Sequence, residues 1–359
     1  MRQNIIVGMS GGVDSSIAAY LLKKQGYHVT GVTMAVWKDG PSNAPKGKHA
    51  CFGPDEKEEI EETQKIADML GISLHVFDCS DNFHETVLKY FKDEYLSGHT
   101  PNPCIICNQK IKLKLLPELA RSAGLSFDKF ATGHYANIEY AESQQRWLLK
   151  KGIDTRKDQS YFLYRLSQEQ LSGLLFPLGN KKKEEIKQLA REINLPVYDK
   201  KESQDFYAGD YKDLLSVEAQ EGNIVDSSGK ILGRHTGFWN FTVGQRKGLR
   251  IAYPEPLYVL SLNSRTNEVL VGTMGELHKK NFLVKDCVWI AIDRLIEPMQ
   301  CTVKIRYAQR EMAAIAIPMG EHEISISLPD GGEAISPGQS AVLYDNDMVI
   351  GGGIISKIL

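Results

Sequence analysis

The segment most able to do chemistry is a short loop of glycine, serine and aspartate near the start of the chain. Residues 9–16 read Met-Ser-Gly-Gly-Val-Asp-Ser-Ser, between an apolar run and an amphipathic segment. Two adjacent glycines let the backbone approach an anion, and a strand-to-helix turn aims N–H groups and the positive helix end at it. Ser10, Ser15 and Ser16 add hydroxyl donors. The loop therefore predicts a phosphate-binding site.

The loop also lacks a residue that other phosphate loops contain. A loop that handles the γ-phosphate of ATP normally carries Gly-Lys followed by Ser or Thr, and no lysine follows Gly12. We therefore expect cleavage between the α and β phosphates, with release of pyrophosphate. Asp14 would repel phosphate, so we expect it to act through Mg²⁺. The segment Ser-Gly-Gly-Val-Asp-Ser resembles the PP-loop of ATP pyrophosphatases, which adenylate their substrates.

Two later segments are expected to complete the nucleotide site. One is the end of the second predicted strand, and the other is Ala-Thr-Gly-His-Tyr at residues 131–135. Ligands of open parallel sheets collect at the carboxyl ends of strands. The residues predicted to bind ATP are Gly8, Met9, Ser10, Gly11, Gly12, Val13, Asp14, Ser15, Met34 and Gly133.

A second reactive segment contains two cysteines. Residues 100–108 read Thr-Pro-Asn-Pro-Cys-Ile-Ile-Cys-Asn, so two prolines stiffen the loop ahead of the thiols. We expect Asn108 to cap the helix that follows. A thiol at a helix N-terminus, with Lys110 and Lys112 near, should have a lowered pKa. Cys107 is therefore the predicted nucleophile, with Cys104 as its partner.

The elements that position these residues follow from apolar spacing. Short buried strands are predicted at 4–9, 28–36, 73–78 and 129–133, and helices at 15–25, 56–70, 82–96 and 109–123. Such alternation predicts an α/β domain with a doubly wound parallel sheet over residues 1–200. A further helix is expected at 181–193, with the lysine-rich run at its start forming a solvated face.

The remainder of the chain has a different residue pattern. Glycine-rich turns and short segments follow, and we assign residues 201–278 to a small central domain. From residue 279 to 359 apolar and polar residues alternate between Pro-Asp-Gly-Gly and Asp-Asn-Asp turns, which predicts an antiparallel β-barrel.

Composition places limits on function. The net charge of −2 argues against a general polyanion binder, although it permits local basic patches. Six cysteines are too few for a disulfide scaffold in a chain of 359 residues. No apolar run approaches the length of a membrane span, and no cleavable leader is evident, so we expect a cytoplasmic protein.

Taken together, the motifs resemble those of the tRNA-specific 2-thiouridylases of the MnmA family, over nearly the whole chain. The matching segments lie at residues 10–15, 100–108, 131–135, 157–162, 242–249, 306–307 and 337–344. The resemblance implies a PP-loop domain, a central domain and a barrel, with ATP and Mg²⁺ as cofactors. It also implies a sulfurtransferase that adenylates the C2 oxygen of the tRNA wobble uridine, after which a persulfide delivers sulfur.

The resemblance further implies contacts with tRNA. The base must leave its stack to reach the loop, and the anticodon stem-loop would be held by shape and phosphate contacts. The residues implied as tRNA-binding are His134, Lys157, Asp158, Gln159, Arg306, Tyr307 and Gln339. The other partner implied is a persulfide or sulfide donor.

The sequence departs from the family at the sulfur chemistry. Cys104 stands where the family has aspartate, and Tyr207 stands where it has a second cysteine. Three accounts stay open. Cys104 and Cys107 form a dithiol relay; or Cys51 joins them as the third ligand of an iron–sulfur cluster; or zinc binds there with His49 or His99.

Two other functions also stay open. One is a PP-loop amide or amidine synthetase that uses an amine in place of sulfur. The other is a catalytically altered relative that binds tRNA and ATP. A rigid Cys-x-x-Cys segment favours sulfur transfer over the amide or amidine synthetase.

Overall fold

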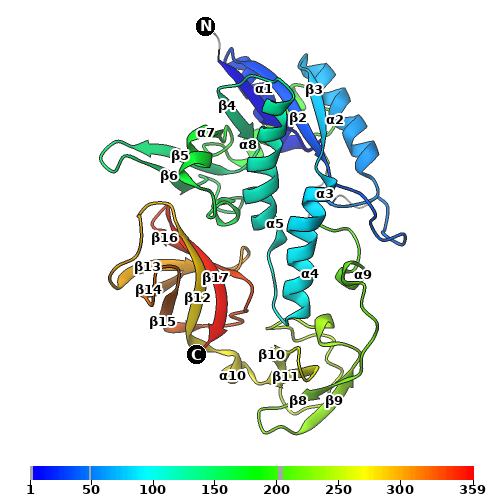
Figure 1. The fold of residues 1–359 in the computed structure, drawn as a ribbon, viewed down its shortest axis with the longest axis vertical. Helices are drawn as coiled ribbons and strands as arrows, with labels where there is room; N and C mark the ends of the chain where they lie inside the picture. The colour runs from blue at the N-terminus through cyan, green and yellow to red at the C-terminus, as the bar shows by residue number, and fades with distance from the viewer. Residues whose placement is uncertain (1–2, 48–49, 201–204) are drawn as a thin grey trace. The chain divides into compact units, whose positions relative to one another are not determined.

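The computed structural model describes residues 3–47, 50–200 and 205–359 (Figure 1). The chain divides into two compact units. The first comprises Met1–Val87, Pro103–Asp210 and Asp347–Val349, and the second comprises Leu88–Asn102, Tyr211–Asn346 and Ile350–Leu359. The predicted boundary at residue 200 adjoins residues 201–204, which lie outside the described part.

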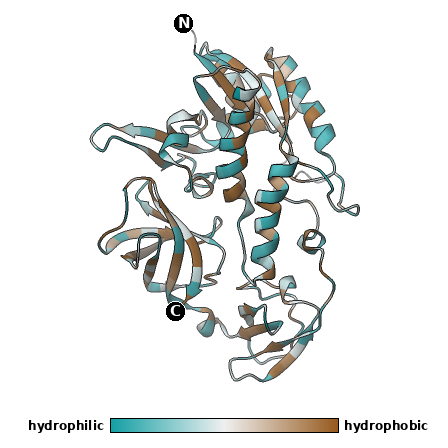
Figure 2. Cartoon of the chain, in the orientation of Figure 1, coloured by the Kyte–Doolittle hydropathy of each residue, from teal (hydrophilic) through white to brown (hydrophobic). Residues whose placement is uncertain are grey.

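The first unit is built on a five-stranded parallel sheet of order β3-β2-β1-β4-β7. The strands are β1 (Asn4–Gly8), β2 (His28–Ala35), β3 (Leu74–Asp78), β4 (Lys129–Thr132) and β7 (Leu174–Leu175). Three consecutive apolar residues of β1 are buried, as expected for a central strand covered on both faces. Figure 2 shows brown, hydrophobic residues among the strands of this sheet. The predicted α/β fold is confirmed.

Helices α1 (Val13–Lys24), α2 (Glu56–Leu70) and α8 (Lys183–Glu192) supply one core of this unit. Ile17, Ile66 and Ile186 pack with Ile5 and Val7 of the central strand. Short elements complete the unit: α3 (Ser80–Phe83), the π-helical η1 (His84–Leu88), the hairpin β5 (Ala136–Ala141) and β6 (Arg146–Lys151), η3 (Ser160–Phe162) and α7 (Gln168–Gly173).

The cysteine segment folds differently from the prediction. The helix begins at Pro103 in α5 (Pro103–Ile106), continues as the π-helical η2 (Cys107–Leu115) and ends in α6 (Leu116–Ser122). Proline suits a first helical position, because its missing N–H has no partner there in any case. The predicted cap at Asn108 is therefore wrong: its side chain donates to the Phe162 carbonyl at 3.3 Å.

The second unit contains α4 (Lys89–Leu96), α9 (Tyr211–Leu215) and a four-stranded sheet of order β10-β11-β8-β9. Its strands are β8 (Gly222–Val225), β9 (Ile231–His235), β10 (Tyr258–Asn263) and β11 (Glu268–Gly272), and the short helices η4 (Phe238–Asn240) and α10 (Met274–Leu277) lie near them in the chain. The rings of Phe91 and Tyr211 meet edge-on at 5.0 Å and join α4 to α9.

The C-terminal strands form the predicted antiparallel barrel. They are β12 (Lys279–Trp289), β13 (Met299–Lys304), β14 (Met312–Pro318), β15 (Ile324–Gly332), β16 (Ser340–Asp345) and β17 (Met348–Ile358). β12 pairs with both β15 and β17, which closes the barrel. Phe282, Val303, Ile326 and Leu343 are fully buried in its core. In the described part of the chain, no helix has the length and apolar character needed to cross a membrane.

Candidate active site

The glycine-serine loop joins β1 to α1, as predicted, and its own hydrogen bonds shape it. Gly11 has a φ of +67°, a conformation that favours glycine. The Ser10 N–H donates to Ser15 Oγ at 3.1 Å, and Ser16 Oγ donates to the Gly12 carbonyl at 2.7 Å. Gly12 occupies the N-cap position of α1 and has no side chain that could accept a hydrogen bond from the helix. The first N–H groups of α1 therefore stay available to a ligand.

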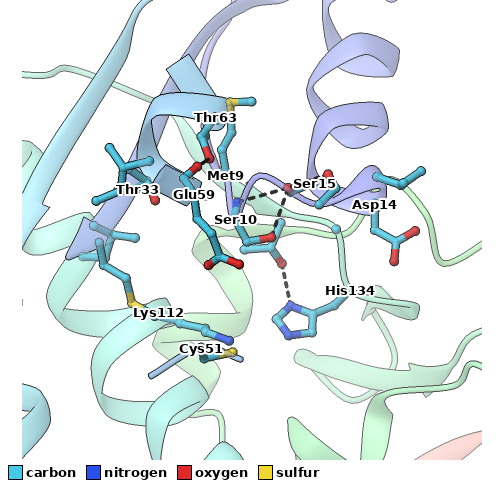
Figure 3. A pocket seen from close by; sticks show the side chains of 18 of the residues that line it. Met9, Ser10, Asp14, Ser15, Thr33, Cys51, Glu59, Thr63, Lys112 and His134 are labelled. Atoms are coloured by element: carbon cyan, nitrogen blue, oxygen red, sulfur yellow. Dashed lines mark hydrogen bonds between the residues drawn. The ribbon is translucent and has the colours of Figure 1, made fainter. Parts of the chain in front are cut away.

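A pocket of about 350 Å³ opens on this loop (Figure 3), a volume typical of small-molecule sites. Strand ends and later segments supply the rest of its wall. Of the predicted ATP-binding residues, those that line it are Gly8, Met9, Ser10, Gly12, Val13, Asp14, Ser15, Met34 and Gly133. Gly11 is not among them, and a Cβ there would meet Thr63 Oγ1 at 2.6 Å.

Gly133 follows β4 and lies directly against the loop. A Cβ at Gly133 would come within 2.7 Å of the Asp14 carbonyl carbon and the Ser15 nitrogen. Backbone atoms cannot rotate away as a flexible side chain can. Glycine is therefore required here for the loop to keep its shape.

Replacing Gly133 with alanine is expected to displace the loop and weaken ATP binding. We expect the affinity for a non-hydrolysable ATP analogue to fall at least about tenfold, or about 1.4 kcal/mol, measured by isothermal titration calorimetry. Gly173→Ala is the matched control, because a Cβ there has no neighbour within 4 Å. Equal affinities of the two variants would contradict the proposed close approach.

Asp14 lies in a charged network that the sequence did not reveal. The Lys183 ammonium donates to both Asp14 carboxylate oxygens at 2.7 and 2.8 Å, and Tyr135 Oη donates to one of them at 2.7 Å. Lys183 lines the pocket and is only 4% exposed. The expectation of a solvated lysine face is therefore wrong at this position.

The backbone of Lys183 is also fixed. Its N–H donates to Asp154 Oδ2 at 3.0 Å, and this bond is the main reason that the pKa of Asp154 lies below its usual value. The buried ammonium thus sits beside the phosphate loop with little freedom to move. No motif marks Lys183, because in sequence it is one of three consecutive lysines.

His134 is a neutral imidazole in the pocket wall. Burial, helped by the charge of Lys112, lowers the pKa of His134 to about 3. One ring nitrogen shares a hydrogen bond with Thr132 Oγ1 at 2.7 Å. At neutral pH His134 can therefore exchange a hydrogen bond with a ligand but cannot add positive charge.

Three thiols near the pocket interact electrostatically with one another. Cys51 is exposed and lines the pocket with Lys112 (Figure 3), while Cys104 is half-buried and Cys107 is buried. Burial raises the pKa of Cys104 to about 12, with the charge of Cys51 adding to the effect. Burial also raises the pKa of Cys107 to about 11, against the opposing charge of Lys112. The predicted lowering of the thiol pKa is wrong, because burial outweighs the nearby cation.

Lys112 responds to all three thiols. Burial lowers the pKa of its ammonium, but the charges of Cys51, Cys107 and Cys104 together raise it above its ordinary value. All three thiols therefore lie within electrostatic range of one cation. We call Cys51, Cys104 and Cys107 the three-thiol site.

The raised pKa values predict how the thiols react with pH. Because Cys104 and Cys107 are protonated at neutral pH, their thiolate fraction should rise about tenfold per pH unit between about pH 7 and about pH 9. We expect the rate of alkylation of both by iodoacetamide, followed by peptide mass spectrometry, to rise in the same proportion. A rate that levels off below about pH 8 would contradict the burial effect.

Comparison with known proteins adds to this geometry. Residues 3–207 match the family described as "tRNA methyl transferase HUP domain", residues 214–273 the "tRNA methyl transferase PRC-barrel domain", and residues 279–355 the "Aminomethyltransferase beta-barrel domain". The chain is 47% identical to the tRNA-specific 2-thiouridylase MnmA of Endomicrobium trichonymphae, covering 99% of each chain. The chain belongs to the MnmA family. It is also 43% identical to the MnmA of Clostridioides difficile, covering 100% of this chain and 99% of the relative.

Membership of the MnmA family confirms the resemblance seen in the sequence. Four of the residues that this resemblance implies for tRNA binding lie in the first unit. In the first unit, Gln159 lines the pocket beside His134, and its side-chain oxygen accepts the Tyr135 N–H at 2.9 Å. Asp158 is buried and accepts the N–H groups of Gly152 and Ser160, both at 3.1 Å. Lys157, by contrast, is half-buried next to them.

The other residues that the MnmA resemblance implies for tRNA lie in the second unit. Arg306 donates to the Val243 carbonyl at 2.9 Å, and Gln339 donates to the Thr100 carbonyl at 2.8 Å. The Lys304 ammonium lies 5.2 Å from the centre of the Tyr307 ring. These contacts all lie within the second unit, and the role of the three residues in tRNA binding stays a prediction.

The position where the MnmA family is expected to have its second cysteine lies close to Cys51 in the chain fold. Tyr207 is buried and forms a parallel bridge with Phe52, whose N–H donates to the Phe206 carbonyl at 2.8 Å. Residues 201–204, earlier in the same motif, lie outside the described part. Nothing in the sequence indicated that Cys51 would meet this segment.

The described side chains do not form the iron–sulfur or the zinc site that the sequence left open. Within residues 3–47, 50–200 and 205–359, no three His, Cys, Asp or Glu side chains are arranged to hold a metal ion. For zinc, His49 lies outside the described residues, and a ring nitrogen of His99 is bonded to Glu94 at 2.8 Å.

Proposed function

We propose that the protein catalyses ATP-dependent 2-thiolation of the wobble uridine of tRNA. One observation carries the proposal: an exposed thiol, Cys51, lines the same pocket as the pyrophosphate-type loop. An adenylating site has no need of a thiol unless sulfur is the incoming group. The curated relatives, named as tRNA-specific 2-thiouridylases, support this substrate.

In the proposed reaction, the loop residues bind the ATP phosphates and hold the α-phosphate near the uridine. The C2 oxygen attacks the α-phosphate, which forms adenylated uridine and releases pyrophosphate. Adenylation turns a poor leaving group into a good one, and a sulfur nucleophile then displaces AMP at C2. The buried Lys183 ammonium is placed to stabilise negative charge that develops on the leaving pyrophosphate.

Magnesium would accompany the nucleotide. Both oxygens of Asp14 already accept hydrogen bonds from Lys183, so Asp14 does not fit a direct ligand of Mg²⁺ in this arrangement. Mg²⁺ commonly binds to substrate phosphates and water, and there it would neutralise phosphate charge. Asp14 instead positions Lys183.

The sulfur is proposed to be handled by thiols of the Cys104–Cys107 segment. A dithiol relay suits this pair better than an iron–sulfur cluster, since the described residues provide no arrangement of three metal ligands. Iron analysis of anaerobically purified protein distinguishes the two accounts. A brown, iron-containing protein that loses iron when Cys51, Cys104 or Cys107 is replaced would favour the cluster.

The substrate is proposed to be held across several segments. His134 and Gln159 line the pocket and would contact the extruded base, while Lys157, Asp158, Arg306, Tyr307 and Gln339 would contact the rest of the anticodon stem-loop. We retain residues 1–200, 201–278 and 279–359 as the proposed domains. We also retain the cytoplasm, where tRNA and ATP are both available, as the proposed location.

The proposal is tested with purified protein, unmodified tRNA, a persulfide donor and ATP carrying radioactive phosphorus in its α-phosphate. We expect labelled AMP and 2-thiouridine to form together. AMP formation with an amine-containing product would favour the amide or amidine synthetase. Tight binding of tRNA and ATP without any product would favour a catalytically altered relative.

A further inference from the structure

One thiol beside the ATP pocket has no part in a relay confined to Cys104 and Cys107. Cys51 is exposed and lines the pocket, whereas Cys104 is half-buried and Cys107 is buried. A sulfur donor therefore meets Cys51 first. Cys51 and Lys112 both line the pocket, and the close-up draws them on the same side of it (Figure 3).

The backbone that carries Cys51 is anchored. Phe52 is only 1% exposed, and its ring stacks on Phe83 at 5.4 Å and contacts Trp37 at 4.6 Å. Its N–H also donates to the Phe206 carbonyl at 2.8 Å. Cys51 is thus a reachable thiol whose backbone is held by a buried neighbour.

The surroundings of Cys51 suit a sulfur anion. The Lys112 ammonium interacts with Cys51, Cys107 and Cys104, and an ammonium group beside a persulfide stabilises its negative terminal sulfur. Cys51 also interacts electrostatically with each of the other two thiols. The buried pair therefore lies within electrostatic range of Cys51.

We propose that Cys51 accepts the sulfur atom and carries it to the activated uridine, and that a thiol of the Cys104–Cys107 pair then releases the product. The inference rests on the proposed function, whose sulfur route it specifies. It gives separate tasks to the exposed and the buried members of the three-thiol site.

Each step conserves atoms and electrons. The Cys51 thiolate attacks the outer sulfur of a persulfide donor. The rest of the donor leaves as a thiolate, and Cys51 becomes a persulfide. The outer sulfur of Cys51 attacks C2 and displaces AMP. A thiol of the pair then attacks Cys51 Sγ and gives up its proton to the departing base, so that the C2–sulfur group leaves as 2-thiouridine and a disulfide to Cys51 forms. An external dithiol reduces this disulfide and supplies the two electrons gained by the transferred sulfur.

The test uses the full-length protein and a small-molecule persulfide labelled with radioactive sulfur. Without ATP or tRNA, we expect the label on the peptide that contains Cys51. After one turnover without reductant, we expect a disulfide from Cys51 to Cys104 or Cys107. Cys51→Ser should retain no label and should lower 2-thiouridine formation at least about a hundredfold.

The matched control is Cys301→Ser, since Cys301 is a partly exposed cysteine in the barrel strand β13; it should behave as the unchanged protein. Cys51 is exposed, so its replacement should leave the melting temperature nearly unchanged. Label on Cys104 or Cys107, with full thiolation by Cys51→Ser, would overturn the role of Cys51 and leave the proposed function intact. A requirement for iron, with no label on Cys51, would also overturn it. Absence of 2-thiouridine from the unchanged protein would overturn the proposed function itself.

Discussion

Replacing Lys183 with methionine is expected to lower ATP-dependent AMP formation by about a hundredfold to a thousandfold. The Lys183 ammonium is the buried cation bonded to Asp14 beside the phosphate loop. Removing a fixed positive charge from a developing negative charge typically costs about 3 to 4 kcal/mol of transition-state stabilisation. The rate of labelled AMP release under saturating tRNA measures this loss.

The control for Lys183 is its neighbour. Lys181→Met changes an exposed lysine two residues away and should leave the rate unchanged. Because Lys183→Met leaves Asp14 without its ion-pair partner, the double change Asp14→Asn with Lys183→Met should recover stability but not activity. Recovery of activity in the double variant would show that Lys183 serves only to neutralise Asp14, and would exclude its role in stabilising the leaving pyrophosphate.

Replacing Cys104 and Cys107 together with serine should abolish thiolation while sparing nucleotide binding. Neither thiol lines the pocket, so affinity for an ATP analogue should stay within about twofold of normal. Loss of the attacking group of a covalent step typically lowers the reaction rate at least about a thousandfold. Quantifying 2-thiouridine in digested tRNA, beside titration of the ATP analogue, separates the two effects.

The double cysteine variant needs one check on folding. Cys107 is buried, and a hydroxyl there costs about 1 to 3 kcal/mol unless it finds a partner. Thermal unfolding shows whether the variant remains folded at the assay temperature. A folded variant that still forms 2-thiouridine at a normal rate would rule out a catalytic role for Cys104 and Cys107.

The parts of the molecule that the sequence predicted well depend on local patterns. The loop before α1 combines glycines with a strand and a helix, and period-two alternation marks the barrel strands. Both signals are local, because side chains a few residues apart share a face. The segments that line the pocket were placed by the rule that ligands collect at the carboxyl ends of strands.

The rest depended on contacts between distant segments. Lys183 meets Asp14 because α8 packs against α1, and Cys51 and Lys112 line one pocket although they lie 61 positions apart in the chain. No spacing in the chain encodes such pairings. The prediction of a lowered thiol pKa failed for the same reason. It used the helix end and the nearby lysines, which are local in the sequence, whereas the burial that raises the pKa depends on the whole fold.

The central claim is that ATP activates the C2 oxygen of uridine, and the fate of that oxygen tests it most directly. The tRNA would carry a heavy oxygen isotope at C2 of the wobble uridine, and the AMP formed in one turnover would be analysed by mass spectrometry. We predict the heavy isotope in the phosphate of AMP, in proportion to the 2-thiouridine produced. Heavy isotope found in pyrophosphate or in water, with none in AMP, would contradict activation of the C2 oxygen by ATP.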